Sequence, residues 1–379
     1  MKKTLSLLAL STLIISSNAG TDNFNDDVIE AKQISNVTEE SLNSIPSKKI
    51  TLYQQYSVHL NDANANKKVE EQKPVEAEAE VSVGYNQKEI GILIKWKDDT
   101  KSVQPAMTTT KFGDGVSVQF PVKYGKGTTL AYIGMGDTKH PVMTYLKKAV
   151  EGRDYQKAFI AEGFGSLTEI SEKGFSFTMK YDDTNKQWIA FIKKPIKTAD
   201  LNLASGLVPV SFAIWDGDSL NRDGNKVISN WKFIKMDKMK TDPAYLKYVS
   251  WGYGDIGNPE RGKELMIQNG CNGCHRFADQ TSAPEGLAPN LSKIGGYSNP
   301  VYLRESIVNP NDVVIRNLNI NRHYNKSAEK DKNGAYPNND MYTWYIKDNK
   351  GNLTSKMPPY THLSEQDLKD IVAYLKTLK

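Results

Sequence analysis

The chain has 379 residues, which is enough for two or three domains, and its 39% hydrophobic and 25% charged residues are typical of an ordinary soluble protein. Its formal net charge of +5 is too small to indicate nucleic-acid binding. With 2 cysteines in the whole sequence, a disulfide-rich scaffold is excluded.

The first 19 residues predict a secretory signal peptide. Lys2 and Lys3 precede an apolar run over residues 5–15, and small residues lead to a cleavage point after Ala19. This apolar run is too short to span a membrane. We therefore expect an exported, periplasmic protein without a transmembrane segment.

Residues 20–45 are polar and acidic without a clear period, and they predict a flexible leader. Residues 61–80 are also poor in apolar side chains and predict an exposed loop. Residues 142–160 could include a short helix. Residues 241–257 are rich in turns and aromatic side chains, which is typical of a connection between two domains.

Residues 46–240 are expected to form an all-β domain. Four runs in this region alternate apolar and polar residues, which is the period of half-buried strands. Turn-forming residues separate the runs, and many short strands with such turns predict a β-sandwich. The four runs cover residues 90–96, 116–122, 175–181 and 208–214.

Two helices are expected to frame residues 258–379. Asn258 can cap a helix that starts at Pro259, and Ser364 can cap the terminal helix with Asp367 as its partner. Gly262 lies in the first of these helices and would allow the two to cross closely. This region is expected to be a separate domain.

The motif Cys271-Asn272-Gly273-Cys274-His275 is typical of c-type haem attachment. Each thiol can add to one haem vinyl group, and the imidazole that follows can bind the iron. A redox dithiol, half of a zinc site and a short disulfide are the alternatives. None of the three requires the adjacent histidine, so we predict one covalent haem c.

Met357 is the candidate for the second axial ligand of that iron. Two prolines follow it and hold the segment non-helical just before the terminal helix. Met341, His323 and His362 are alternatives, although the histidines are expected at the surface. A helix before the haem and another at the end is the plan of class I cytochromes c. Residues 258–379 therefore predict an all-α cytochrome c fold, with a polar insertion around 316–355.

The β domain has no Walker sequence, no GxGxxG and no serine-nucleophile elbow. Its most unusual segment places Gly134 and Gly136 on either side of Met135. Glycines at these positions would let backbone approach a flat ligand closely. From the residues alone, Met135 is expected to be an ordinary core methionine.

Several motifs of this domain resemble the haem-binding subunit of ethylbenzene dehydrogenase and its relatives. Those relatives include the small subunits of selenate, chlorate and dimethyl-sulfide redox enzymes of the molybdenum family. The resemblance covers about residues 48–236. Its motifs are Ile94-Lys95-Trp96-Lys97-Asp98, the run from Gly113 to Val122, Gly134-Met135-Gly136-Asp137 and Ala213-Ile214-Trp215-Asp216-Gly217.

The resemblance implies a β-sandwich that holds one non-covalent haem b between a methionine and a lysine. Met135 matches the methionine, with Gly134 and Gly136 beside the haem, and Lys226 is carried over as the lysine. A ligating lysine must be neutral, which burial can achieve by lowering its pKa. A solvated turn lysine at Lys226, or His140 as the ligand, are the alternatives.

Together these patterns predict a periplasmic dihaem electron-transfer protein that is not itself an enzyme. It would be the haem subunit or redox partner of a molybdopterin oxidoreductase and pass single electrons between an iron–sulfur subunit and a soluble carrier. The family's subunit usually ends after the β domain, so the fused cytochrome c is a departure. The alternatives are a monohaem cytochrome c fused to a ligand- or protein-binding sandwich, and a haem enzyme with an open coordination site.

Overall fold

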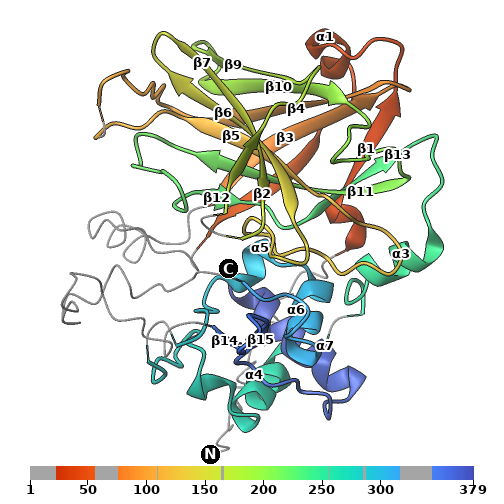
Figure 1. Cartoon of the computed structure of the whole chain (residues 1–379), viewed down its shortest axis with the longest axis vertical. Coiled ribbons are helices and arrows are strands. Elements are labelled where there is room, and N and C mark those ends of the chain that lie inside the picture. Colours follow the sequence, from red (N-terminus) through yellow and green to blue (C-terminus); the bar gives the residue numbers. More distant parts are fainter. Residues whose placement is uncertain are drawn as a thin grey trace, which may run out of the picture.

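The computed structural model describes residues 23–55, 76–108, 110–163, 166–255, 257–284, 287–315 and 344–379. The predicted signal peptide and most of the polar insertion lie outside these residues. The chain forms a β part (Val28–Met236) and a helical part (Pro259–Thr377), which stack along the longest axis of the molecule (Figure 1). In the described residues, we find no helix of the length and apolar character that a membrane crossing requires.

The β part is built from a 13-stranded sheet that folds over into two layers around an apolar core (Figure 1). The four alternating runs of the sequence coincide with β4, β5, β9 and β11. Their inward side chains, such as Ile94, Phe120 and Phe212, are almost completely buried. The strands are β1 Val28–Gln33, β2 Lys48–Gln54, β3 Glu76–Tyr85, β4 Glu89–Lys97, β5 Gly115–Pro121, β6 Val142–Val150, β7 Arg153–Ala161, β8 Thr168–Ile170, β9 Ser176–Asp182, β10 Gln187–Pro195, β11 Leu207–Trp215, β12 Val227–Ile228 and β13 Lys232–Met236.

The predicted flexible leader is wrong for the described residues from 23 onward. β1 pairs in parallel with both β13 and β3, because Ile29 and Ala31 belong to the core between the layers. The short helix α1 (Glu39–Asn43) follows and buries Leu42. This segment is therefore part of the sheet.

The helix considered within residues 142–160 is also wrong. β6 and β7 form an antiparallel hairpin there, and Gly152 adopts a φ of 63° at its turn. Of the predicted exposed loop 61–80, residues 76–80 begin β3, and the remainder lies outside the described residues.

The helical part follows a helix α3 (Pro243–Val249) that lies within the predicted linker. Asn258 caps α4 and Ser364 caps α7 with Asp367, as predicted. A Cβ atom on Gly262 would collide with the carbonyl of Asp370 on α7, so the glycine allows the close crossing. The elements are α4 Pro259–Gln268, the 3₁₀ turn η2 Cys271–Gly273, α5 Ile294–Tyr297, α6 Pro300–Val308, the hairpin of β14 Tyr345–Lys347 and β15 Leu353–Ser355, and α7 Glu365–Thr377. Because of this hairpin, the helical part is not strictly all-α.

The two parts share a buried interface. Asn299 precedes α6, and its side chain exchanges two hydrogen bonds with the backbone of Trp231 in the β part. Gly296 packs so closely on Tyr53 that a Cβ atom there would lie 2.5 Å from the Tyr53 ring. One apolar cluster continues from β11 through this interface to α7.

Candidate haem sites

The Cys271–His275 motif starts at the end of α4. Gly270 adopts a φ of 72° and turns the chain into η2, and the His275 N–H donates to the Cys271 carbonyl at 2.8 Å. This single helical turn brings Cys271, Cys274 and His275 to one cavity. Both thiols are free, which leaves them available for covalent attachment.

A backbone hydrogen bond orients the imidazole of His275. Its Nδ1 lies 2.8 Å from the Pro289 carbonyl, so Nδ1 carries the proton and donates to that oxygen. Nε2 is then the unprotonated nitrogen that can bind a metal. Burial lowers the pKa of His275, which favours the neutral imidazole that iron requires.

The cavity around His275 has a volume of about 250 Å³ and mostly apolar walls. Met357 also lines this cavity. Its backbone N–H donates to Ser355 Oγ at 3.0 Å, and this bond holds the backbone just before the two prolines. The residues present thus supply two thiols, an imidazole and a thioether around one apolar cavity, which is the donor set of a haem c with His and Met ligands. The lining residues include Leu287, Leu291, Ile294, Leu303, Ile307, Val314, Ile315 and Leu375.

The alternative ligands differ in position. His362 is exposed, and its Nε2 lies 2.9 Å from Asn269 Oδ1, outside the cavity lining. His323 and Met341 lie outside the described residues. Met357 therefore stays the predicted ligand, now with a position in the cavity wall.

One wall residue of this cavity comes from the β part. Tyr132 is buried, and its ring centre lies 6.1 Å from that of Tyr302 on α6, which also lines the cavity. No pattern in the sequence predicts Tyr132 at this place, except that it is three residues from Met135. Tyr132 lines the cavity because the β part packs against the helical part.

Met135 lies in a tight turn. The Gly136 N–H donates to the Tyr132 carbonyl at 2.9 Å, and Met135 and Gly136 have φ values of 77° and 68°. A Cβ atom on Gly136 would lie 2.6 Å from the His140 carbonyl, so this glycine makes room for the protein's own backbone. Whether Gly136 also lies beside a haem stays a prediction. Gly134 is buried in the same turn.

His140 is engaged by a neighbouring carboxylate. Its Nδ1 lies 3.1 Å from both oxygens of Asp137, which is completely buried. The hydrogen bond and charge of Asp137, with the charge of Asp312, raise the pKa of His140. This shift favours the imidazolium in the haem-free protein. An Nδ1–H group donated to Asp137 would still leave Nε2 able to bind a metal, so His140 stays the alternative to Lys226.

The Met135 turn lies over an outer face of the sheet. Gln119 on β5 donates from Nε2 to the Ile133 carbonyl at 2.9 Å and to Ser211 Oγ on β11 at 3.3 Å. Ser117 and Ala213, two residues further along these strands, lie opposite each other and are small and buried. Trp215 is the next residue of β11 on the same face. It lies four residues after Ser211, which corresponds to about 13 Å along the strand.

Lys226 lies at the Trp215 end of this face. It is 7% exposed, and its Nζ is 5.4 Å from the centre of the Trp215 ring and 3.3 Å from the Asp223 carbonyl. Burial lowers the pKa of Lys226 to about 8. The alternative of a solvated turn lysine is therefore wrong. Met135 and Lys226 are associated with opposite ends of one face, with the small Ser117–Ala213 pair between them.

The side chain of Gln55 indicates that a polar group binds beside Lys226. Its backbone N–H donates to the Lys226 carbonyl at 3.1 Å, while its side chain is 1% exposed. Among the residues that the structure describes, neither Nε2 nor Oε1 has a hydrogen-bond partner. Such an unpaired buried amide is unfavourable. A haem with carboxylate side chains would supply a partner, so the residues at this face fit a haem b.

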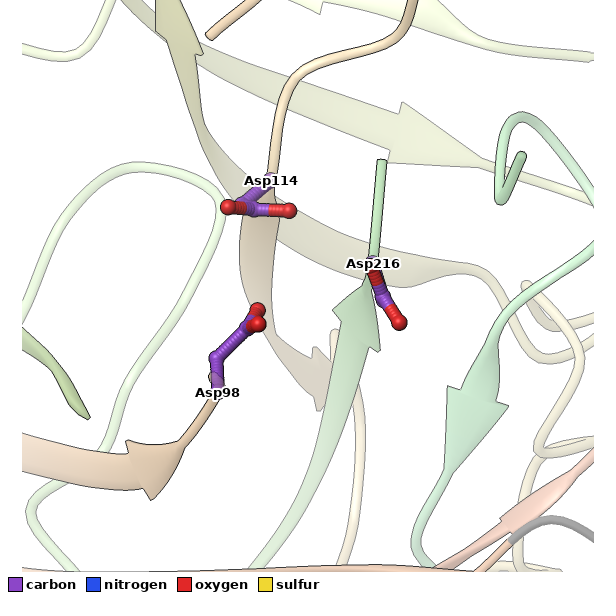
Figure 2. A group of neighbouring side chains, drawn as sticks. All are labelled: Asp98, Asp114 and Asp216. Atoms are coloured by element: carbon purple, nitrogen blue, oxygen red, sulfur yellow. The ribbon is translucent and has the colours of Figure 1, made fainter. Parts of the chain in front are cut away.

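Three carboxylates converge elsewhere in the β part, where β4 ends, β5 begins and β11 ends. Figure 2 shows Asp98, Asp114 and Asp216, whose oxygens lie within 4.8 Å of one another. Asp114 is completely buried and accepts hydrogen bonds from the N–H groups of Gly217 (2.8 Å) and Ser102 (2.7 Å). Burial raises the pKa of Asp114 to about 7. These contacts make the group a structural junction of three loops.

Comparison with known proteins identifies a cytochrome c domain and several relatives. The cytochrome c family model matches residues 259–379. A protein assigned as respiratory nitrate reductase heme subunit ORF7 of Haloferax mediterranei is 23% identical over 224 residues, which covers 58% of this chain and 75% of that protein.

Two further relatives are gamma subunits. Dimethylsulfide dehydrogenase subunit gamma of Rhodovulum sulfidophilum is 26% identical over 38% of this chain and 55% of its own length. Chlorate reductase subunit gamma of Ideonella dechloratans is 30% identical over 36% of this chain and 56% of its own length. This chain thus spans little more than half of either gamma subunit. It carries a cytochrome c domain and is homologous to subunits of reductases and a dehydrogenase, which supports a role in electron transfer.

Proposed function

We propose that this protein is a periplasmic dihaem electron-transfer protein, with a covalent haem c in the helical part and a non-covalent haem b in the β part. The observation that carries the proposal is the apolar cavity that both His275 and Met357 line, next to the two free thiols. The haem irons supply the one-electron chemistry when bound.

In the helical part, each residue has a separate task. Cys271 and Cys274 would hold the ring through thioether bonds, and the Pro289 carbonyl leaves the His275 Nε2 able to bind the iron. Met357 would supply a thioether, which would favour reduced iron and raise the potential. The mostly apolar wall would limit the access of water to the bound haem.

In the β part, we place haem b between Met135 and Lys226. The depressed pKa of Lys226 lowers the energy needed to present a neutral amine to the iron. Ser117 and Ala213 carry small side chains between the two candidate ligands, and the amide of Gln55 would be available to a polar group of the haem.

The partner in this proposal is a molybdopterin oxidoreductase, for which this chain is the haem subunit or the direct redox partner. The names of the relatives, two of which are gamma subunits of a dehydrogenase and a reductase, support this kind of partner. Electrons would pass between an iron–sulfur subunit and a soluble carrier. The protein would then not be the catalytic subunit.

The test is a pyridine haemochrome spectrum of the exported protein, resolved into b-type and c-type haem. Equal amounts of both are expected. Met135→Ala and Lys226→Ala should each lose the b-type signal and keep the c-type signal, whereas Met107→Ala and Lys88→Ala, at exposed positions, should keep both. Haem c alone in the wild-type protein would instead support a monohaem cytochrome c fused to a binding module.

A further inference from the structure

The loop between β5 and β6 connects the two candidate haem sites. We call residues 129–140 the connecting loop. It contains Met135, the candidate ligand of haem b, and Tyr132, a wall residue of the haem c cavity. The hydrogen bond from the Gly136 N–H to the Tyr132 carbonyl, at 2.9 Å, holds both in one turn.

The connecting loop is bonded to the helical part at several points. Thr129 Oγ1 donates to Asp312, and Lys139 Nζ donates to the Asn311 carbonyl at 2.8 Å. The Leu130 N–H donates to the Tyr248 hydroxyl at 3.1 Å, on the helix α3 that joins the two parts. The loop is therefore held against the haem c cavity.

The same contacts reach the other candidate axial ligand. Asn311 Oδ1 accepts from the Ser355 N–H at 2.7 Å, and Ser355 Oγ accepts from the Met357 N–H at 3.0 Å. Lys139, Asn311, Ser355 and Met357 thus form a continuous series of contacts. The backbone segments that carry Met135 and Met357 are fixed relative to each other by this series.

We propose that the connecting loop is the electron path between the two haems, with Tyr132 as the side chain placed between them. This inference rests on the proposed function. One electron leaves a ferrous iron at one site, which becomes ferric, and reduces a ferric iron at the other; no bond breaks and no proton is transferred. Since both sites belong to one chain with docked parts, the transfer is intramolecular.

The packing around Tyr132 supports this path. Tyr132 is 4% exposed, and its ring packs against Tyr302 in the helical part. Tyr132 thus joins the Met135 turn to the helical part through a backbone hydrogen bond and a packed ring contact. An electron following this path would therefore cross bonded and packed atoms throughout.

The experiment uses the full-length dihaem protein. A light pulse generates a small amount of a one-electron reductant, and the separate α-bands of the b-type and c-type haems follow the redistribution of the electron. The expected relaxation is first order and independent of protein concentration. Tyr132→Ala should slow it several-fold, Tyr132→Phe should preserve it, and Tyr155→Ala on β7 is the matched control outside the shared cluster.

Haem content and both midpoint potentials are measured for every variant, so that a slower rate at unchanged potentials reports the path itself. Tyr302→Leu tests the same contact from the helical part if Tyr132→Ala does not fold. A rate that rises with protein concentration, or equal rates in Tyr132→Ala and Tyr155→Ala with both haems bound, would overturn the inference and leave the proposed function standing. Absence of haem b from the wild-type protein would overturn both.

Discussion

Replacing Asn299 with alanine should weaken the contact between the β part and the helical part. The Asn299 side chain is 1% exposed. Its Oδ1 accepts from the Trp231 N–H at 2.9 Å, and its Nδ2 donates to the Trp231 carbonyl at 2.8 Å and to the Tyr253 hydroxyl at 3.0 Å. Alanine would leave both backbone groups of Trp231 buried without these partners.

The magnitude follows from those two groups. A buried polar group without a partner costs about 1–3 kcal/mol, and water entering the small space left by the amide would recover part of this. We therefore expect the free energy of unfolding to fall by about 2–4 kcal/mol. Equilibrium unfolding in guanidinium chloride, followed by far-UV circular dichroism on the haem-loaded protein, measures it.

Asn352→Ala is the matched control, because Asn352 is exposed and bonds within its own β14–β15 turn. Such a surface change should stay within about 0.5 kcal/mol of the wild type. If Asn299→Ala also stayed within that range, the Asn299–Trp231 contact would not contribute as argued.

Three further changes test the sites and the acidic junction. Gln55→Leu removes the unpaired amide, so in a Met135→Ala background it should raise the free energy of unfolding of the haem b-free protein by about 1–3 kcal/mol. In an otherwise wild-type chain, the same change should speed the transfer of haem b to apomyoglobin. Slower transfer would refute the amide's role. Met357→His should lower the midpoint potential of haem c in a redox titration, because a thioether favours reduced iron; an unchanged potential would exclude Met357 as a ligand. Because the pKa of Asp114 is raised, the folded state binds the proton of this carboxyl more tightly than the unfolded state does. The contribution of this protonation to the free energy of unfolding is complete below pH 3.8 and is lost as the pH rises to about 7. Asp114→Asn should remove this part of the pH dependence of unfolding, on the order of 4 kcal/mol in total; an identical pH profile would contradict the assignment.

Local signals were sufficient for the two framing helices of the helical part, α4 and α7. The caps at Asn258 and Ser364 act over three residues, and the contact that Gly262 makes with α7 follows from the absence of a side chain. The cysteine spacing likewise lies within a single turn. Such features depend on neighbours in the sequence, so the sequence can reveal them.

The missed features depend on distant partners. β1 is polar at several positions and looks unstructured alone, but its pairing partner β13 lies about two hundred residues away, where Val28 pairs with Phe233. Alternation in β6 is obscured by Lys147 and Lys148, whose long side chains are largely covered in the folded chain. Tyr132 and Gln55 gain their roles from docking and from burial, which no short segment encodes.

The position of Tyr132 in the cavity wall affects the midpoint potential expected for haem c. Water around a haem favours the more highly charged ferric form, so the potential of haem c depends on how completely its cavity excludes solvent. Because Tyr132 of the β part closes part of that cavity, the potential is a property of the docked chain. A partner that drew the two parts apart would lower the driving force for reducing haem c, and by linkage reduction of haem c would tighten the docking.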